Sequence, residues 1–192
     1  MRKDAVKKYL CNFSESFRIN APINRKWRHT LIIPVYREFE PLLNNLKSLP
    51  TPSGDLLVVL VINKPLWEQK NDSNQEIRNF VNNLNESFKK NNEAKIKRLK
   101  DGIDILVIDL EKLFGSKAAC GVGLARKIGC DLALAWHSAG AIESDWLSST
   151  DADAILPPDY FDRIESIDSI NKIICWPNPH RTINPRSNII II

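Results

Sequence analysis

Residues 56–62, Leu56-Leu-Val-Val-Leu-Val-Ile62, form the longest apolar run of the chain. A further apolar run is Leu31-Ile-Ile33, which ends at Pro34, and residues 104–110, DILVIDL, are apolar apart from two aspartates. Continuous apolar strands are typical of a sheet that is buried on both faces. A helix is expected between the first two strands, over residues 41–49, and this strand–helix–strand order predicts parallel pairing. The expected fold is therefore α/β and Rossmann-like, with a mostly parallel sheet flanked by helices.

Length and composition indicate one domain across residues 1–192, with 43% hydrophobic residues and a net charge of +4. A charge this small does not require a nucleic acid, and no nucleic-acid partner is expected. The four cysteines lack Cys-x-x-Cys spacing, so neither a zinc site nor a disulfide framework is expected. The first residues lack a signal-peptide core, and no apolar run is long enough to cross a bilayer. We expect a cytoplasmic protein without a transmembrane segment, and this expectation leaves peripheral contact with a membrane open.

Two aspartates stand at the end of another expected strand. The stretch Trp146-Leu-Ser-Ser-Thr150 is interpreted as the strand, and Asp151-Ala-Asp153 follows it directly. In an extended chain residues i and i+2 point to the same side, so both carboxylates would face one point. Carboxylates that close repel each other unless a cation is present, and hard oxygen ligands suit Mg²⁺ or Mn²⁺. An Asp-rich turn capping the helix expected over residues 158–167 is the alternative, and a further strand is expected at 172–176.

Three segments, in this order along the chain, resemble family 2 glycosyltransferases, which have the GT-A fold. They are Leu31-Ile-Ile-Pro-Val-Tyr-Arg37, Gly123-Leu-Ala-Arg-Lys-Ile-Gly129, and Asp151-Ala-Asp153 with Leu156-Pro-Pro-Asp-Tyr-Phe161. They are similar to the first strand with its nucleotide-binding turn, to an Ala-Arg-Asn-x-Gly helix and to the Asp-x-Asp (DXD) metal region. The resemblance extends from Thr30 to Ile174.

The resemblance implies transfer of a sugar from a nucleotide-diphospho-sugar to a hydroxyl acceptor. It also implies inversion at the anomeric carbon and a divalent metal, Mg²⁺ or Mn²⁺, on Asp151 and Asp153. The acceptor class, whether glycan, lipid or small molecule, is left open. The residues implied for nucleotide-sugar binding are Pro34, Val35, Tyr36, Glu38, Asn63, Arg126 and Asp151.

Three of these residues have plainer interpretations. Tyr36 could be a half-exposed aromatic in a turn, and Arg126 could be a solvent-facing arginine. At Ile62-Asn63-Lys-Pro65 the family usually has an Asp-Asp-Gly-Ser type of turn. Asn63 can hydrogen-bond a base edge but supplies no carboxylate, and a plain turn is the alternative there.

Two accessory elements are expected. An amphipathic helix is expected over residues 3–17. Residues 66–102 are polar and form an insertion relative to the family, with a helix over 74–90 followed by a charged connection. This insertion has two alternative interpretations, a lid over the donor site and a surface excursion. The basic run at residues 95–100 is interpreted as a solvated helix face.

An inverting transfer needs a general base, and none can be named after Asp153, so the catalytic residue is unknown. We therefore expect the chain to be the amino-terminal, donor-binding part of a longer glycosyltransferase, without the acceptor half and inactive by itself. A catalytically silent nucleotide-sugar-binding or assembly module is the alternative function. A nucleotide-dependent oxidoreductase is a third interpretation, but it rests on Gly121-Val-Gly123 alone, and Arg126 replaces the third glycine of that fingerprint.

Overall fold

The structure, a computed structural model, describes residues 3–15, 19–65, 67–68, 73–87, 96–114 and 121–166. Its helices are α1 (Lys3–Asn12), α2 (Phe39–Ser48), α3 (Gln75–Asn82), α4 (Leu110–Phe114), α5 (Val122–Ser138) and α6 (Tyr160–Glu165). Its strands are β1 (His29–Val35), β2 (Leu56–Ile62), β3 (Ile96–Lys100), β4 (Ile103–Asp109) and β5 (Ser148–Ser149). The strand expected at 172–176 lies outside the described residues.

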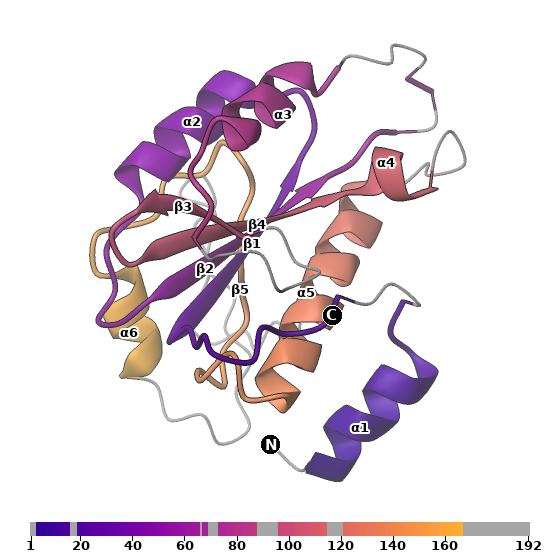
Figure 1. Cartoon of the computed structure of the whole chain (residues 1–192), viewed down its shortest axis with the longest axis vertical. Helices are drawn as coiled ribbons and strands as arrows, with labels where there is room; N and C mark the ends of the chain where they lie inside the picture. The colour runs from indigo at the N-terminus through magenta and orange to yellow at the C-terminus, as the bar shows by residue number, and fades with distance from the viewer. Residues whose placement is uncertain are drawn as a thin grey trace, which may run out of the picture.

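The strands form one sheet in the order β3-β4-β2-β1-β5 (Figure 1). β4, β2, β1 and β5 are parallel, and β3 pairs antiparallel with β4 at one edge. The predicted α/β architecture, a mostly parallel sheet flanked by helices, is therefore confirmed, and it is compatible with a Rossmann-like fold.

Both faces of the sheet are covered, and β2, the middle strand, is apolar at every position. In β2, Leu57, Val59 and Val61 pack toward α5 on one face. The alternate residues, such as Val58 and Leu60, pack toward α2, α3 and α6 on the other face. Figure 1 shows this division of the helices, with α1 on the outer side of α5.

β1 continues beyond its expected end, so Pro34 and Val35 lie inside the sheet and are buried. Ile32 faces β5, because its carbonyl oxygen accepts a hydrogen bond from the Thr150 N–H at 3.0 Å. Position 34 faces the same side, since backbone orientation repeats every two residues in a strand. Pairing with β5 ends at Ile32 and Ser149, so the missing N–H of the proline interrupts no ladder bond.

Part of the polar insertion belongs to the sheet, contrary to prediction. Residues 96–100 form the edge strand β3 instead of a solvated helix face, and Gly102, with φ +73°, turns the chain into β4. Only Ile96 of this strand is buried, and cationic side chains on an edge strand oppose pairing with another chain. α3 ends at Asn82, so the helix expected over 74–90 is wrong in its second half: residues 83–87 leave the helix.

Several other elements are shorter than predicted. α1 ends at Asn12 and not at residue 17, and α6 covers six residues of the range 158–167. β5 comprises two residues of the five expected at 146–150, and the short helix α4 was not predicted. None of the helices in the described ranges is long and apolar enough to cross a membrane.

α5 lies unusually close to the sheet at Gly129. A Cβ atom at this position would be 2.5 Å from Ile32 Cγ2 and 3.1 Å from Val61 Cγ2. Separations below about 3 Å are inside van der Waals contact, so a larger side chain would push the helix away. The glycine therefore sets the distance between α5 and the two central strands.

A buried carboxylate ties the amino-terminal segment to β4. Asp104 is fully buried and accepts hydrogen bonds from Trp27 Nε1 (2.9 Å) and Ser87 Oγ (2.8 Å). It also forms ion pairs with Arg25 (3.0 Å) and Arg98 (2.8 Å). Four donors around one carboxylate compensate for its removal from water.

Candidate functional site at the carboxyl edge of the sheet

The strand order reverses between β1 and β5. β2 and β4 are added on one side of β1, whereas β5 is added on the other. α2, which follows β1, packs on one face of the sheet, and α5, which precedes β5, packs on the opposite face. The carboxyl ends of β1 and β5 lie side by side at this reversal, and ligands of open α/β sheets bind outside the carboxyl ends of the strands at such a point.

Asp151 and Asp153 lie at this reversal point, in the turn that follows β5. The Ala154 N–H donates to the Asp151 carbonyl oxygen at 3.2 Å, so residues 151–154 form a turn and not the extended segment that was predicted. Ala152 is 1% exposed and packs into the apolar layer under the turn, whereas both carboxylates are exposed. Both aspartate side chains are therefore available to a ligand, although a turn presents them and not an extended strand end.

Arg126 reaches the same turn from the first half of α5. Its Nη2 donates to Asp151 Oδ1 at 2.5 Å, and its Nε donates to Ser149 Oγ at 3.0 Å. Arg126 is therefore not merely a solvent-facing arginine, because its side chain is 33% exposed and is paired with Asp151. One positive charge therefore lies directly against this turn of residues 151–154, which we call the aspartate turn.

Glu38 lies between the end of β1 and the start of α2, near the aspartate turn. Burial raises the pKa of the Glu38 carboxyl group, and the negative charges of Asp153 and Asp151 raise it further. The three carboxylates therefore lie near enough to repel one another. A bound cation would relieve this repulsion.

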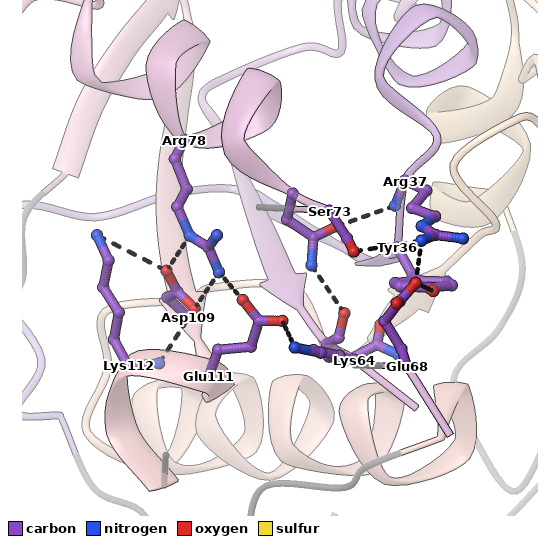
Figure 2. Close-up of polar contacts among 11 residues, drawn as sticks. Tyr36, Arg37, Lys64, Glu68, Ser73, Arg78, Asp109, Glu111 and Lys112 are labelled. Carbon is purple, nitrogen blue, oxygen red and sulfur yellow. Dashed lines mark hydrogen bonds and ion pairs between the residues drawn. The ribbon is translucent and has the colours of Figure 1, made fainter. Parts of the chain in front are cut away.

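Glu68 contacts Tyr36 and Arg37, the two residues that follow β1. The Tyr36 hydroxyl donates to Glu68 Oε2 at 2.6 Å, and Arg37 forms an ion pair with the same oxygen (Figure 2). Partial burial and this hydrogen bond raise the pKa of Tyr36 to about 12. The exposed indole of Trp67 meets the Tyr36 ring edge-on, at a centroid distance of 6.1 Å.

Asn74, which is fully buried, joins this segment to the ends of β1 and β2. Its Oδ1 accepts from the Arg37 N–H at 2.9 Å, and its Nδ2 donates to the Asn63 carbonyl oxygen at 3.0 Å. Arg37 has a φ of +60°, a left-handed backbone conformation that is strained for a non-glycine residue. The asparagine therefore stabilises a strained backbone at the edge where a ligand is expected.

Asn63 is 4% exposed, and its N–H donates to the Val35 carbonyl oxygen at 3.0 Å. The side chains of Pro34 and Val35 are buried within β1. Of the residues implied for nucleotide-sugar binding, the structure brings Glu38, Arg126 and Asp151 together. It places Tyr36 beside this group, in the network of Glu68.

A second polar group lies farther along the same edge, beyond the end of β4. Arg78 of α3 is nine-tenths buried and pairs with Asp109 (2.8 Å) and with Glu111 (Figure 2). Lys64 lies 3.9 Å from the other oxygen of Glu111. These pairs neutralise one another and fasten α3 and α4 to the sheet, so this group serves the architecture of the edge.

Comparisons of the chain with protein-family models, with curated proteins and with solved structures find no match.

The aspartate turn suits a divalent cation that takes only one or two ligands from the protein and the rest from water or substrate. Within the described ranges, no three acidic, histidine or cysteine side chains are close enough to hold a metal by themselves. Mg²⁺ is commonly bound through one or two carboxylates together with water and substrate phosphates. The exposed oxygens of Asp151 and Asp153 fit that mode of binding, with Glu38 adding negative charge nearby.

Sequence reasoning missed the residues that shape the site without forming a motif. Glu68 and Asn74 lie in the stretch interpreted as an insertion, yet both hold the end of β1. Neither residue has a distinctive spacing to Tyr36 or Arg37. The available signal was a single acidic residue beside an exposed tryptophan, which is too weak to assign a contact.

Proposed function

We propose that this chain binds a nucleotide-diphospho-sugar together with Mg²⁺ or Mn²⁺, as the donor-binding part of a GT-A glycosyltransferase resembling family 2. The observation that carries the proposal is the aspartate turn, which is paired with Arg126 and lies close enough to feel the charge of Glu38, at the point where the strand order reverses. Acidic groups for a cation and a guanidinium for phosphate oxygens occur together there. A diphosphate with a divalent ion needs both.

Each group has a distinct task in the proposed site. Asp151 and Asp153 would hold the divalent ion, which supplies charge stabilisation for a departing diphosphate. Arg126 would exchange part of its contact with Asp151 for a phosphate oxygen, because a guanidinium binds either anion in the same geometry. Trp67 and Tyr36 offer an exposed aromatic surface for the base at the end of β1.

Calorimetry with UDP and with GDP, each with and without Mn²⁺, tests the proposal. We expect nucleotide binding that requires the metal. Asp153→Asn should abolish the metal-dependent binding, because it removes one charge of the metal site while keeping the shape of the side chain. Asp101→Asn, an exposed carboxylate in the turn between β3 and β4, is the matched control and should bind like the wild type. Metal-independent binding, or no binding of any nucleoside diphosphate, would contradict the proposal.

A nucleotide-sugar-binding module without catalysis is the second candidate, and the acidic residues after the turn favour it. Asp159 pairs with Arg163 at 2.6 Å. Glu165 pairs with Arg28 and His29, at the amino-terminal end of β1, opposite the site. Incubation with nucleotide sugars, Mn²⁺ and mixed acceptors separates the two candidates. Glycoside formation supports the transferase, and metal-dependent binding with donor hydrolysis at most supports the module.

A further inference from the structure

Asn45 is a polar residue at an apolar position. It lies on the buried side of α2 beside Leu42 and Leu46, and it is 1% exposed. The helical pattern alone would favour a third leucine here, because burying an amide is costly unless it is hydrogen-bonded. The reason for an asparagine must therefore lie in what its amide contacts.

The amide of Asn45 contacts the aspartate turn from below. Its Nδ2 lies 3.3 Å from the Asp151 carbonyl oxygen and 3.3 Å from the Ala152 carbonyl oxygen. Carbonyl oxygens only accept hydrogen bonds, so the NH₂ group must be the end of the amide that faces the turn. Oδ1 then points away, and it has no hydrogen-bond partner among the described residues.

These contacts fix the backbone that carries both carboxylates. The Asp151 carbonyl oxygen accepts from Asn45 on one side and from the Ala154 N–H, at 3.2 Å, on the other. The methyl group of Ala152 is packed in the same apolar layer. The turn is thus held at its first carbonyl groups and at its central residue, while its acidic side chains remain exposed.

We propose that Asn45 is a positioning residue for the divalent cation, setting the direction in which Asp151 and Asp153 present their oxygens. The inference rests on the proposed function, because it concerns the same metal. The unpartnered Oδ1 separates this role from a purely structural one. An asparagine that served packing alone would leave one buried acceptor unsatisfied without any compensating contribution, and leucine would pack better.

The test compares Asn45→Leu with the wild type in two measurements, thermal unfolding and Mn²⁺ affinity in the presence of UDP or GDP. We expect the melting temperature to stay within a few degrees or to rise. We expect the Kd for Mn²⁺ to increase about ten- to a hundredfold, as is typical when a residue that orients metal ligands is lost. Ser48→Ala, which removes a hydroxyl bonded to the Asn45 carbonyl oxygen on the same helix, is the control and should leave the Kd unchanged.

Equal Mn²⁺ affinity in a folded Asn45→Leu variant would overturn the inference while leaving the proposed function intact. A wild type that binds no metal would overturn both. If the variant does not fold, ¹⁵N NMR of the wild type titrated with Mg²⁺ and nucleotide decides the question. The Asn45 side-chain NH₂ signal should then shift in step with the Asp151 and Asp153 amides, and a signal that stays in place would refute the positioning role.

Discussion

Arg126 Nη2 lies 2.5 Å from Asp151 Oδ1, so α5 supplies the counter-charge for the aspartate turn when no ligand is bound. The same guanidinium is the candidate partner of a diphosphate. Metal and nucleotide should therefore be coupled: a cation that takes over Asp151 releases Arg126 for phosphate.

Arg126→Ala should separate the two halves of this exchange. Loss of a charge-assisted hydrogen bond costs about 1.5–3 kcal/mol, so the affinity for UDP or GDP should fall about ten- to a hundredfold. Mn²⁺ alone should bind more tightly than to the wild type, because Asp151 loses a competing positive charge. Calorimetry measures both constants, and Lys47→Ala, an exposed cation in the last turn of α2, is the control. Unchanged nucleotide affinity would restrict Arg126 to its role as the partner of Asp151.

Glu38→Gln should raise thermal stability in a pH-dependent way. The pKa of Glu38 is raised in the folded protein, so its contribution to stability is present at acid pH and is lost as the pH rises through the raised pKa. At neutral pH the variant removes the repulsion from Asp153 and Asp151, and its melting temperature should exceed that of the wild type.

The melting-temperature difference between Glu38→Gln and the wild type should shrink toward zero as the pH falls below about 4, where the wild-type carboxyl is also neutral. Glu40→Gln removes an exposed carboxylate from the first turn of the same helix and should give no such gain. A difference that is constant with pH would show that repulsion among the carboxylates is not its cause.

Asp104→Asn should be among the most destabilising single changes in the chain. Arg25 and Arg98 would lose their buried counter-charge, and breaking a buried ion pair from one side typically costs about 3–5 kcal/mol. Chemical denaturation would show this as a lower midpoint. Asp101→Asn, three residues away and exposed, should change the free energy of unfolding by less than about 0.5 kcal/mol. Arg25 also pairs with Asp55 at 2.6 Å, so equal stability of both variants would mean that this pair and solvent are enough to compensate the two arginines.

Gly129→Ala and Gly123→Ala should change stability in opposite directions. At Gly129 the added methyl group would overlap Ile32, and overpacking costs about 1–3 kcal/mol. At Gly123 no atom lies within 4 Å of the added methyl group, so the higher helix propensity of alanine should stabilise α5 by up to about 1 kcal/mol. Denaturant unfolding of the two variants measures both signs. A stable Gly129→Ala variant would mean that α5 can shift away from β1.

The central sheet could be predicted because burial on both faces leaves a strong mark on sequence. Residues 56–62 are β2, residue for residue, and the third predicted strand is displaced from β4 by one residue. β3 could not be predicted in this way. An edge strand is half solvated, so Lys97, Arg98 and Lys100 give residues 96–100 the composition of a surface helix.

The candidate site was predictable only where its residues stand in a motif. Asp151 and Asp153 were proposed from their spacing, and the turn that presents them differs from the extended chain that was expected. Asn45 and Asn74 act across long sequence separations through single amide groups. Such contacts depend on how helices are placed on the sheet, and no local pattern encodes them.

Pro34 limits how far β5 can follow β1. An N–H at position 34 would be the next donor toward β5, directed at the carbonyl of Thr150, and the chain has no hydrogen there to offer. Continued pairing of β5 with β1 would therefore gain an acceptor at Pro34 but no donor, and the chain instead continues into the aspartate turn. An imino acid at this position of a buried strand therefore leaves the β1–β5 ladder one donor short at the level where the aspartate turn begins.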